Sequence, residues 1–145
     1  MPHSYNKIWI HAIFSTKDRE PLIRLDFEQA IYAHIKEQLI GIGCPVRIIN
    51  GMDDHVHLLF LLNPQKAITD VLKQIKGNTS HWINEQSFIQ GKFAWQTGYA
   101  AYSVSESQLG TVYNYILNQK QHHRKKTFAE EYESFVKLHG LAPDI

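Results

Sequence analysis

The sequence lacks the features that mark secreted and membrane-spanning proteins. Its 145 residues include a single cysteine, Cys44, so no disulfide can form within the chain, and this usage is typical of a reducing cytoplasm. No apolar run reaches the roughly 18 residues needed to span a bilayer, and the first residues lack the basic and then apolar order of a signal peptide. We therefore expect a cytoplasmic protein without a membrane partner.

The chain also lacks a large excess of charge of either sign. Its formal net charge is +1, whereas nucleic-acid binders often have a strongly basic balance, so global charge gives no support for that class. The charge is nevertheless uneven, because four basic residues gather near the C-terminal end: Lys120, Arg124, Lys125 and Lys126. Such a group is either a solvated helix face or a surface for the phosphates of DNA.

Internal repeats, low-complexity segments and linkers are also missing, which predicts a single domain over residues 1–145. The hydrophobic patterns predict, in order, a strand at 8–14, a helix at 27–42, hairpin strands at 45–50 and 55–62, a helix at 68–84, one or two short strands within 92–104, a helix at 105–123 and a last helix at about 127–139. Asp26, Ser105 and Thr127 are the expected N-caps of three of these helices.

This order of elements predicts an α+β fold. Strand, helix, two strands, helix and strand are the order of a ferredoxin-like fold, in which helices pack on a mostly antiparallel sheet. Many unrelated functions share this architecture, so the fold class cannot by itself identify an activity.

A histidine pair stands at the start of one very apolar segment, "GMDDHVHLLFLL" (residues 51–62). Side chains alternate between the two faces of a strand, so His55 and His57 are expected to point the same way and their ring nitrogens can converge on one ion. Val56 then points to the opposite face. Hydrogen-bonded structural histidines at a strand end are the alternative interpretation, because buried imidazoles need partners.

The segment "LGTVYNYILNQKQHH" (residues 109–123) predicts a helix with two separate faces. Its core-facing stripe consists of Leu109, Val112, Tyr113 and Ile116. Tyr115 lies well outside that stripe, and Gln119 and His122 share its side at i+4 and i+7. The helix therefore presents a phenol, an amide and an imidazole on one polar strip, although Tyr115 alone could be an ordinary half-exposed tyrosine.

The pair and the polar strip together indicate a chemistry. Two imidazoles and an amide oxygen form a mixed N/O site that suits Mg²⁺ or Mn²⁺ better than a thiolate-loving metal. Such an ion can polarise a phosphodiester oxygen, and a tyrosine can then attack phosphorus to form a covalent phosphotyrosine. That linkage retains the energy of the phosphoester, so strand joining would need no ATP.

Four segments carry a resemblance to a known family. They are "MDDHVHLLF", "IKGNTSHWIN", "FAWQTGYAAYSVS" and "YILNQKQHHRKKTF", in that order along the chain. They resemble the single-tyrosine transposases of the insertion-sequence-two-hundred-like family and their repeat-associated relatives, which are His-hydrophobic-His (HUH) nucleases acting on single-stranded DNA. The resemblance extends over about residues 5–132, with a catalytic core at about 5–126.

The resemblance implies a role for each matching residue. His55 and His57 match the pair that binds the divalent metal, Gln119 matches the third metal ligand, and Tyr115 matches the nucleophile that takes the 5′-phosphate. Members of the family are homodimers whose sheets join across the interface, and in some of them the tyrosine helix completes the partner's site. They recognise hairpins near the ends of the element and cut the flanking single strand.

The basic residues of the C-terminal region acquire a possible role from the same resemblance. Contacts with the DNA backbone are expected for Lys120, Arg124, Lys125 and Lys126. His122 and His123 match the family pattern after the glutamine, but the residues give them no assigned step.

Three other functions stay open at this point. A domesticated relative would keep the chemistry and act on repeated genomic hairpins. A non-catalytic nucleic-acid-binding module with the same sheet would bind without cutting. A metal-dependent hydrolase would use an activated water in place of Tyr115. The sequence does not decide the hairpin that is recognised, the metal used, or whether one subunit or two build the site.

Overall fold

The computed structural model describes residues 4–121, 130, 133 and 137–139. Four strands form its sheet: β1 (Trp9–Ser15), β2 (Val46–Gly51), β3 (His55–Leu61) and β4 (Ala100–Val104). The labelled helical elements of the described residues are η1 (Lys17–Arg19), α1 (Glu28–Gly41), α2 (Ile68–Gln86), η2 (Glu106–Gln108) and α3 (Leu109–Leu117), of which η1 and η2 are 3-10 turns. In the part of the chain that is described, no helix is both long and apolar enough to cross a bilayer.

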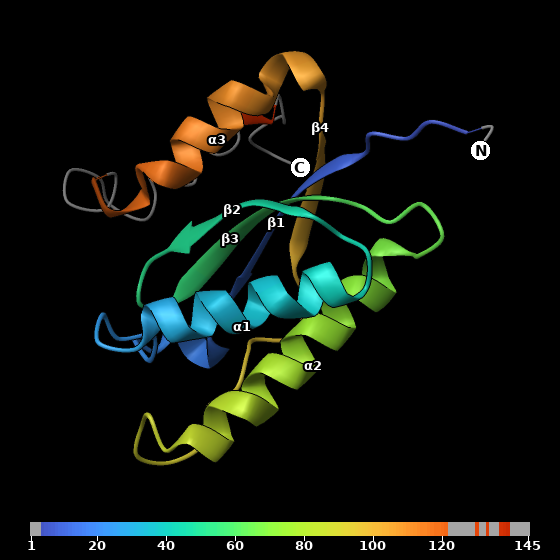
Figure 1. Ribbon diagram of the computed structural model, residues 1–145. Coiled ribbons are helices and arrows are strands. Elements are labelled where there is room, and N and C mark those ends of the chain that lie inside the picture. Colours follow the sequence, from blue (N-terminus) through green and yellow to red (C-terminus); the bar gives the residue numbers. More distant parts are fainter. Residues whose placement is uncertain (1–3, 122–129, 131–132, 134–136, 140–145) are drawn as a thin grey trace.

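The sheet has the strand order β2-β3-β1-β4, and all neighbouring strands are antiparallel. This confirms the predicted ferredoxin-like α+β fold. Helices α1 and α2 lie side by side on one face of the sheet, and α3 lies across the other face (Figure 1). Strand β3 is central and is buried on both sides, as its continuous apolar sequence requires.

The alternation of side chains divides β3 between two cores. Val56, Leu58 and Phe60 are fully buried in the larger core, against α1 and α2. Leu59 points the other way and packs with Val112 and other apolar residues in the smaller core under α3. The smaller core is apolar at one end only, because the histidines of β3 occupy the other end of the same face.

Helix α1 follows the predicted apolar spacing, but its N-cap differs from the prediction. Ile31, Ile35 and Leu39 are fully buried, and Gly43, with a φ of 81°, turns the chain after the helix. Asp26 does not cap this helix: the N-cap position is Phe27, which has no side-chain cap bond. Asp26 instead pairs with Arg24, two residues earlier, at 3.4 Å, and both side chains are largely exposed.

The predicted helix over 105–123 is interrupted in the structure. It opens as the 3-10 turn η2, and Ser105 bonds the hydroxyl of Ser107 at 3.0 Å rather than capping the helix. Helix α3 then ends at Leu117, Asn118 leaves the helical conformation at φ −95° and ψ 19°, and a helical turn resumes at residues 119–121. The expected capping box at Thr127 lies outside the described residues.

The segment 92–104 forms one strand, β4, and one isolated bridge between Trp95 and Thr16. Trp95 and Phe93 are buried, and both rings pack edge-on within the larger core. Phe93 and Trp95 therefore belong to the core, whereas Tyr99 is exposed.

Gly51 approaches the backbone of His55 and Val56 closely in the β2–β3 hairpin, so a larger residue at this position should destabilise the fold. A Cβ on Gly51 would overlap the carbonyl oxygen of His55 and would lie 2.9 Å from Cα of Val56. We expect Gly51→Ala to lower the free energy of unfolding by about 1–3 kcal/mol, measured by urea denaturation.

The matched control is Gly77→Ala, at a position within α2 where an added Cβ meets nothing within 4 Å. This variant should be more stable than the wild type by about 0.5–1 kcal/mol, since alanine favours a helix over glycine. Equal stability of Gly51→Ala and the wild type would contradict the close hairpin.

Candidate metal and nucleophile site

The two histidines of β3 point to the same face of the sheet, as predicted. His55 and His57 are 5% and 2% exposed and lie opposite Ser15 and Ile13 of β1. Val56 between them faces the larger core. The neighbouring strands β1 and β2 hold both rings at the start of β3, close to the turn that follows α3.

A carboxylate orients His55. Nδ1 of His55 lies 2.7 Å from Oδ1 of Asp54, and Oδ2 of Asp54 accepts bonds from Nε and Nη2 of Arg19 at 3.1 and 3.0 Å. Burial raises the pKa of Asp54, but the hydrogen bond from His55 and the charge of Arg19 outweigh it, so the pKa is lowered and the group stays ionised. An ionised carboxylate only accepts, so Nδ1 of His55 is the donor.

Gln119, the third predicted metal ligand, also contacts His55. Oε1 of Gln119 lies 3.2 Å from Nε2 of His55, and Gln119 is fully buried. In a ring whose one proton is on Nδ1, Nε2 offers a lone pair to a cation, as does the amide oxygen Oε1 of Gln119. Two neighbouring ligands of an octahedral ion, each about 2.1 Å from it, lie about 3.0 Å apart. The spacing and the two facing acceptors therefore fit a bound divalent cation.

The interruption of α3 brings Gln119 inward. Nδ2 of Asn50 donates to the carbonyl oxygens of Ile116 and Leu117 at 3.0 and 3.1 Å, which satisfies the end of the helix. The chain then turns at Asn118. Helical spacing placed Gln119 on the side of Tyr115, and in the structure Gln119 lies beside His55 while Tyr115 lies beside His57. The interruption of the helix after Leu117 was not predicted.

Tyr115 lies beside the histidines in the same chain. Its ring centroid is 5.7 Å from that of His57 and 6.4 Å from that of His11, and the side chain is half-buried. Both Tyr113 and Tyr115 pack against the smaller core. They differ in their other neighbours, because the ring of Tyr113 lies beneath the guanidinium of Arg47 at 5.0 Å and the ring of Tyr115 lies beside the histidines.

His11 belongs to the site and was missed in the sequence. It is fully buried on β1, its Nε2 lies 2.9 Å from Nδ1 of His57, and its Nδ1 lies 2.7 Å from Nε2 of His139. Burial, and then the neighbouring His139, lower the pKa of His11 to about 3, and burial lowers that of His139 to about 4. A single histidine inside the apolar strand "IWIHAIF" was the available signal, but pairing it with His57 required the strand register.

The basic residues are only partly described. Nζ of Lys120 bonds Oε1 of Glu28 at 3.2 Å, Oδ1 of Asn50 at 3.2 Å and the carbonyl oxygen of Gly51 at 2.5 Å. Lys120 thus ties the segment after α3 to α1 and to the hairpin, and its contact with DNA stays a prediction. Arg124, Lys125, Lys126, His122 and His123 lie outside the described residues.

The carboxylate that holds Lys120 also affects a buried phenol. The hydroxyl of Tyr32 lies 3.5 Å from Oε2 of Glu28, and both residues are buried. Burial and the charge of Glu28 raise the pKa of Tyr32 well above its ordinary value of 10.0. The folded protein therefore keeps this phenol neutral in alkaline solution.

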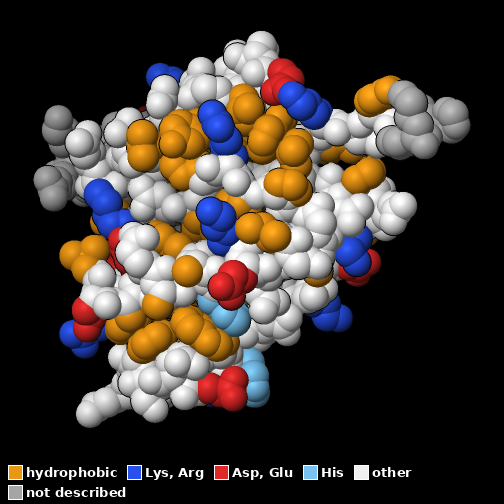
Figure 2. Space-filling model, viewed as in Figure 1, with side chains coloured by type: hydrophobic (Ala, Val, Ile, Leu, Met, Phe, Trp, Pro, Cys, Tyr) orange, Lys and Arg blue, Asp and Glu red, His pale blue; other side chains and the backbone are white. Residues whose placement is uncertain are grey.

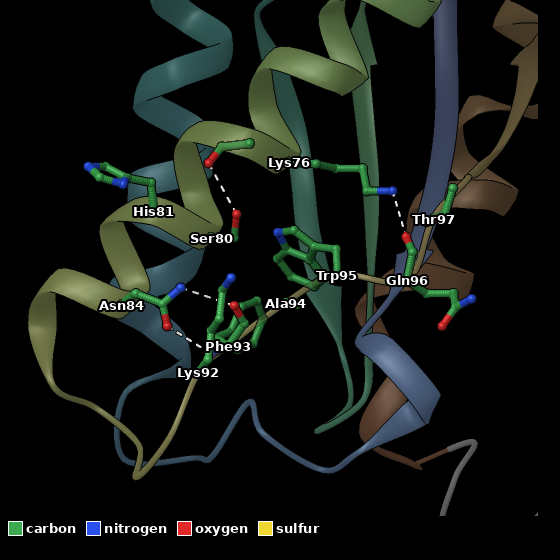
Figure 3. Close-up of a pocket in the computed structure, with 11 residues that line it drawn as sticks. Lys76, Ser80, His81, Asn84, Lys92, Phe93, Ala94, Trp95, Gln96 and Thr97 are labelled. Carbon is green, nitrogen blue, oxygen red and sulfur yellow. Dashed lines mark hydrogen bonds between the residues drawn. The ribbon is translucent and has the colours of Figure 1, made fainter.

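An open groove of about 490 Å³ lies between α2 and residues 92–97, and none of the predicted site residues lines it. Lys76 crosses it to bond the carbonyl oxygens of Gln96 and Gly98 at 2.8 and 2.6 Å, and Asn84 makes two bonds to the backbone of Phe93 (Figure 3). These contacts fasten the segment before β4 to the helix, which is a structural role.

The chain is similar to transposases. It matches the family model described as transposase IS200 like over residues 4–119. It is 26% identical to the ISDra2 transposase TnpA of Deinococcus radiodurans over 114 residues, which cover 75% of this chain and 81% of that protein.

Two solved structures share the fold. A protein described as a transposase from Deinococcus radiodurans has a TM-score of 0.66 at 24% identity, and the match covers 82% of this chain and 95% of that one. A REP-associated tyrosine transposase bound to a REP hairpin has a TM-score of 0.61 at 14% identity, covering 85% and 73%.

The raised pKa of Tyr32 predicts a loss of stability in alkali. Above about pH 10 the phenol ionises in the unfolded chain but not in the folded protein, so the unfolded state binds fewer protons and the free energy of unfolding falls with pH. Relative to Tyr32→Phe, the wild type should lose up to about 1.4 kcal/mol per pH unit.

Urea denaturation between pH 8 and 11 measures this difference. Tyr5→Phe is the control, because the Tyr5 side chain is 82% exposed, and it should follow the wild type at every pH. A constant difference between wild type and Tyr32→Phe across the range would contradict the role given to burial.

Proposed function

The chain belongs to the family of IS200-like transposases, and we propose that it cuts and rejoins single-stranded DNA through a covalent phosphotyrosine at Tyr115, with a divalent metal held by His55, His57 and Gln119. The observation that carries this proposal is the meeting of a phenol, two imidazoles and an amide oxygen at one end of β3. Transposases act on DNA, and this set of groups suits phosphoryl transfer.

In the proposed cleavage of a DNA strand, the metal and Tyr115 have different roles. A bound Mg²⁺ or Mn²⁺ would polarise a phosphodiester oxygen and stabilise developing negative charge. The phenol of Tyr115 gives up its proton as its oxygen attacks phosphorus, the bond from phosphorus to the 3′ oxygen breaks, and a proton passes to that oxygen, which leaves as a free 3′-hydroxyl. A 3′-hydroxyl attacking the phosphotyrosine reverses these steps and joins the strands without ATP.

The surrounding residues keep the ligands in place. Arg19 and Asp54 hold the ring of His55 by consecutive hydrogen bonds, as carboxylates often do for metal-binding histidines. Arg19 does so from a left-handed backbone conformation, at φ 54°, and such conformations occur where the surroundings impose them. The support for a rigid site is therefore local and specific.

The proposed substrate is single-stranded DNA with hairpins. The structural neighbour bound to a REP hairpin supports a hairpin-bearing partner for this fold. The DNA backbone would be met by the basic residues after α3, for which we propose Lys120, Arg124, Lys125 and Lys126. Salt dependence of binding would report on these contacts.

We also propose a homodimer whose sheet continues across the interface. Strands β2 and β4 are the two edges of the sheet, and an edge strand presents backbone groups for pairing with another chain. Hydrophobic side chains gather on the side of the molecule that carries β2 and α3 (Figure 2). Because Tyr115 and the histidines meet within one chain, each subunit could cut DNA with its own tyrosine.

A role on repeated genomic hairpins is the second candidate. The observation that favours it is the shared fold with the REP-associated tyrosine transposase. The identity to that protein is 14%, against 26% to the insertion-sequence transposase, so transposition is the first choice. A gene flanked by element ends supports transposition, and a gene alone among scattered repeats supports the second role.

The nucleophile is tested with a hairpin-bearing single strand and Mn²⁺. The wild type should form a covalent protein–DNA adduct visible in a denaturing gel, and Tyr115→Phe should form none, since the attacking oxygen is missing. Tyr113→Phe is the matched control on the same helix and should retain the adduct. DNA cleavage that persists in Tyr115→Phe would favour a hydrolase with an activated water, and binding without cleavage in the wild type would favour a non-catalytic module.

The metal ligands are tested by the metal requirement of adduct formation. Excess chelator should abolish the adduct, and Gln119→Ala should raise the Mn²⁺ concentration for half-maximal cleavage by about tenfold or more, because an oxygen ligand is lost. Gln121→Ala, an exposed glutamine in the same short turn, should behave as wild type. An adduct that forms in excess chelator would refute the metal role.

A further inference from the structure

We propose that His11 and His139 are positioning residues for His57, and that the three rings form one hydrogen-bonded chain that orients His57 for metal binding. Nε2 of His11 lies 2.9 Å from Nδ1 of His57, and Nδ1 of His11 lies 2.7 Å from Nε2 of His139. This inference rests on the proposed metal site and extends it to β1 and to the C-terminal segment.

Metal binding sets the direction of every proton in this chain. With Nδ1 of His57 engaged by His11, Nε2 is the nitrogen that can bind a metal, and the proton of a neutral His57 is then on Nδ1. Nδ1–H of His57 donates to Nε2 of His11, so the proton of His11 is on its own Nδ1 and donates to Nε2 of His139. The opposite direction would place a proton on Nε2 of His57 and prevent coordination.

The fold holds the chain of rings firmly. His11 is fully buried on β1, next to β3, and its ring stacks on that of His57 with centroids 5.2 Å apart. His139 stacks on Tyr102 of β4 with centroids 4.3 Å apart and planes 20° from parallel. Residues on β1, on β4 and in the C-terminal segment thus fix the orientation of one imidazole on β3.

The two proposed metal-binding histidines are therefore oriented by different hydrogen-bond acceptors. His55 donates to a carboxylate, whereas His57 donates to a neutral imidazole. The DNA phosphate is itself an anion, so a second carboxylate next to the metal would add repulsion. An imidazole acceptor orients His57 without adding negative charge.

Titration of metal-free protein with Mn²⁺, followed by isothermal calorimetry without DNA, tests the proposal. His11→Phe keeps the ring volume and removes the acceptor, and it should weaken Mn²⁺ binding by about 10–100-fold. His11→Gln supplies an acceptor and a donor and should restore affinity to within a few-fold of wild type. His34→Phe is the matched control: His34 lies on α1 and stacks on Trp82, and its replacement should leave the affinity unchanged.

Nitrogen-15 spectra of the histidine rings give a second measurement that a purely structural role would not affect. In Mg²⁺-loaded wild type, His57 and His11 should both be neutral and protonated on Nδ1. A proton on Nε2 of His11 in that state would overturn the proposal, since His11 could not then accept from His57. The circular dichroism of each variant is compared with wild type, and His139→Phe provides a second break in the chain if His11→Phe does not fold.

The outcomes separate this inference from the proposed function. If Mn²⁺ affinity is the same in wild type and in the His55→Ala, His57→Ala double variant, the metal site itself is wrong and both proposals fall. If the double variant loses binding while His11→Phe binds as tightly as wild type, the metal site stands and the positioning role is refuted. Weaker binding in His11→Phe that His11→Gln does not restore also refutes it, because the hydrogen bond would not be the cause.

Discussion

The site depends on one constraint, which is that every buried ring nitrogen needs a partner. Three histidines are almost completely enclosed between the sheet and α3, and an unpaired polar atom there would cost about 1–3 kcal/mol. Asp54 lies where Nδ1 of His55 points, and His57 and His139 lie where the two nitrogens of His11 point. The same requirement that stabilises the rings also fixes their orientation, so the arrangement suits metal binding with little further ordering.

A second requirement is that α3 must end where it does. Asn50 satisfies the last carbonyls of the helix, and Lys120 joins the following turn to Glu28 and to the hairpin. These contacts come from β2, including Gly51 at its end, and from α1. The position of Gln119 therefore depends on how α3 packs against both of these elements. Tyr115, the proposed nucleophile, lies one turn earlier, on the regular part of the helix, where helical spacing alone decides its direction.

The proposed site combines a rigid half with a half that is held by fewer contacts. The histidines belong to the central strand, with neighbours on both sides and a core on each face. Tyr115 belongs to the short helix α3, which lies over the opposite face from α1 and α2 (Figure 1), and Gln119 belongs to the turn that follows it. A central strand opens only with the whole sheet, whereas a surface helix can move at lower cost. This division suits a reaction in which the DNA strand held by the tyrosine must be moved between cleavage and joining.

Local periodicity was enough to predict much of this protein from its sequence. The alternation of β3 put His55 and His57 on one face, the helical repeat separated Tyr115 from Tyr113, and the order of elements indicated the ferredoxin-like sheet. Those features depend on neighbours within a few residues. The partnership of His11 with His57 depends on strand register, and the burial of Gln119 depends on an asparagine 69 residues away. Only the tertiary structure decided these, because a hydrogen bond between distant segments leaves no periodic signal in the chain.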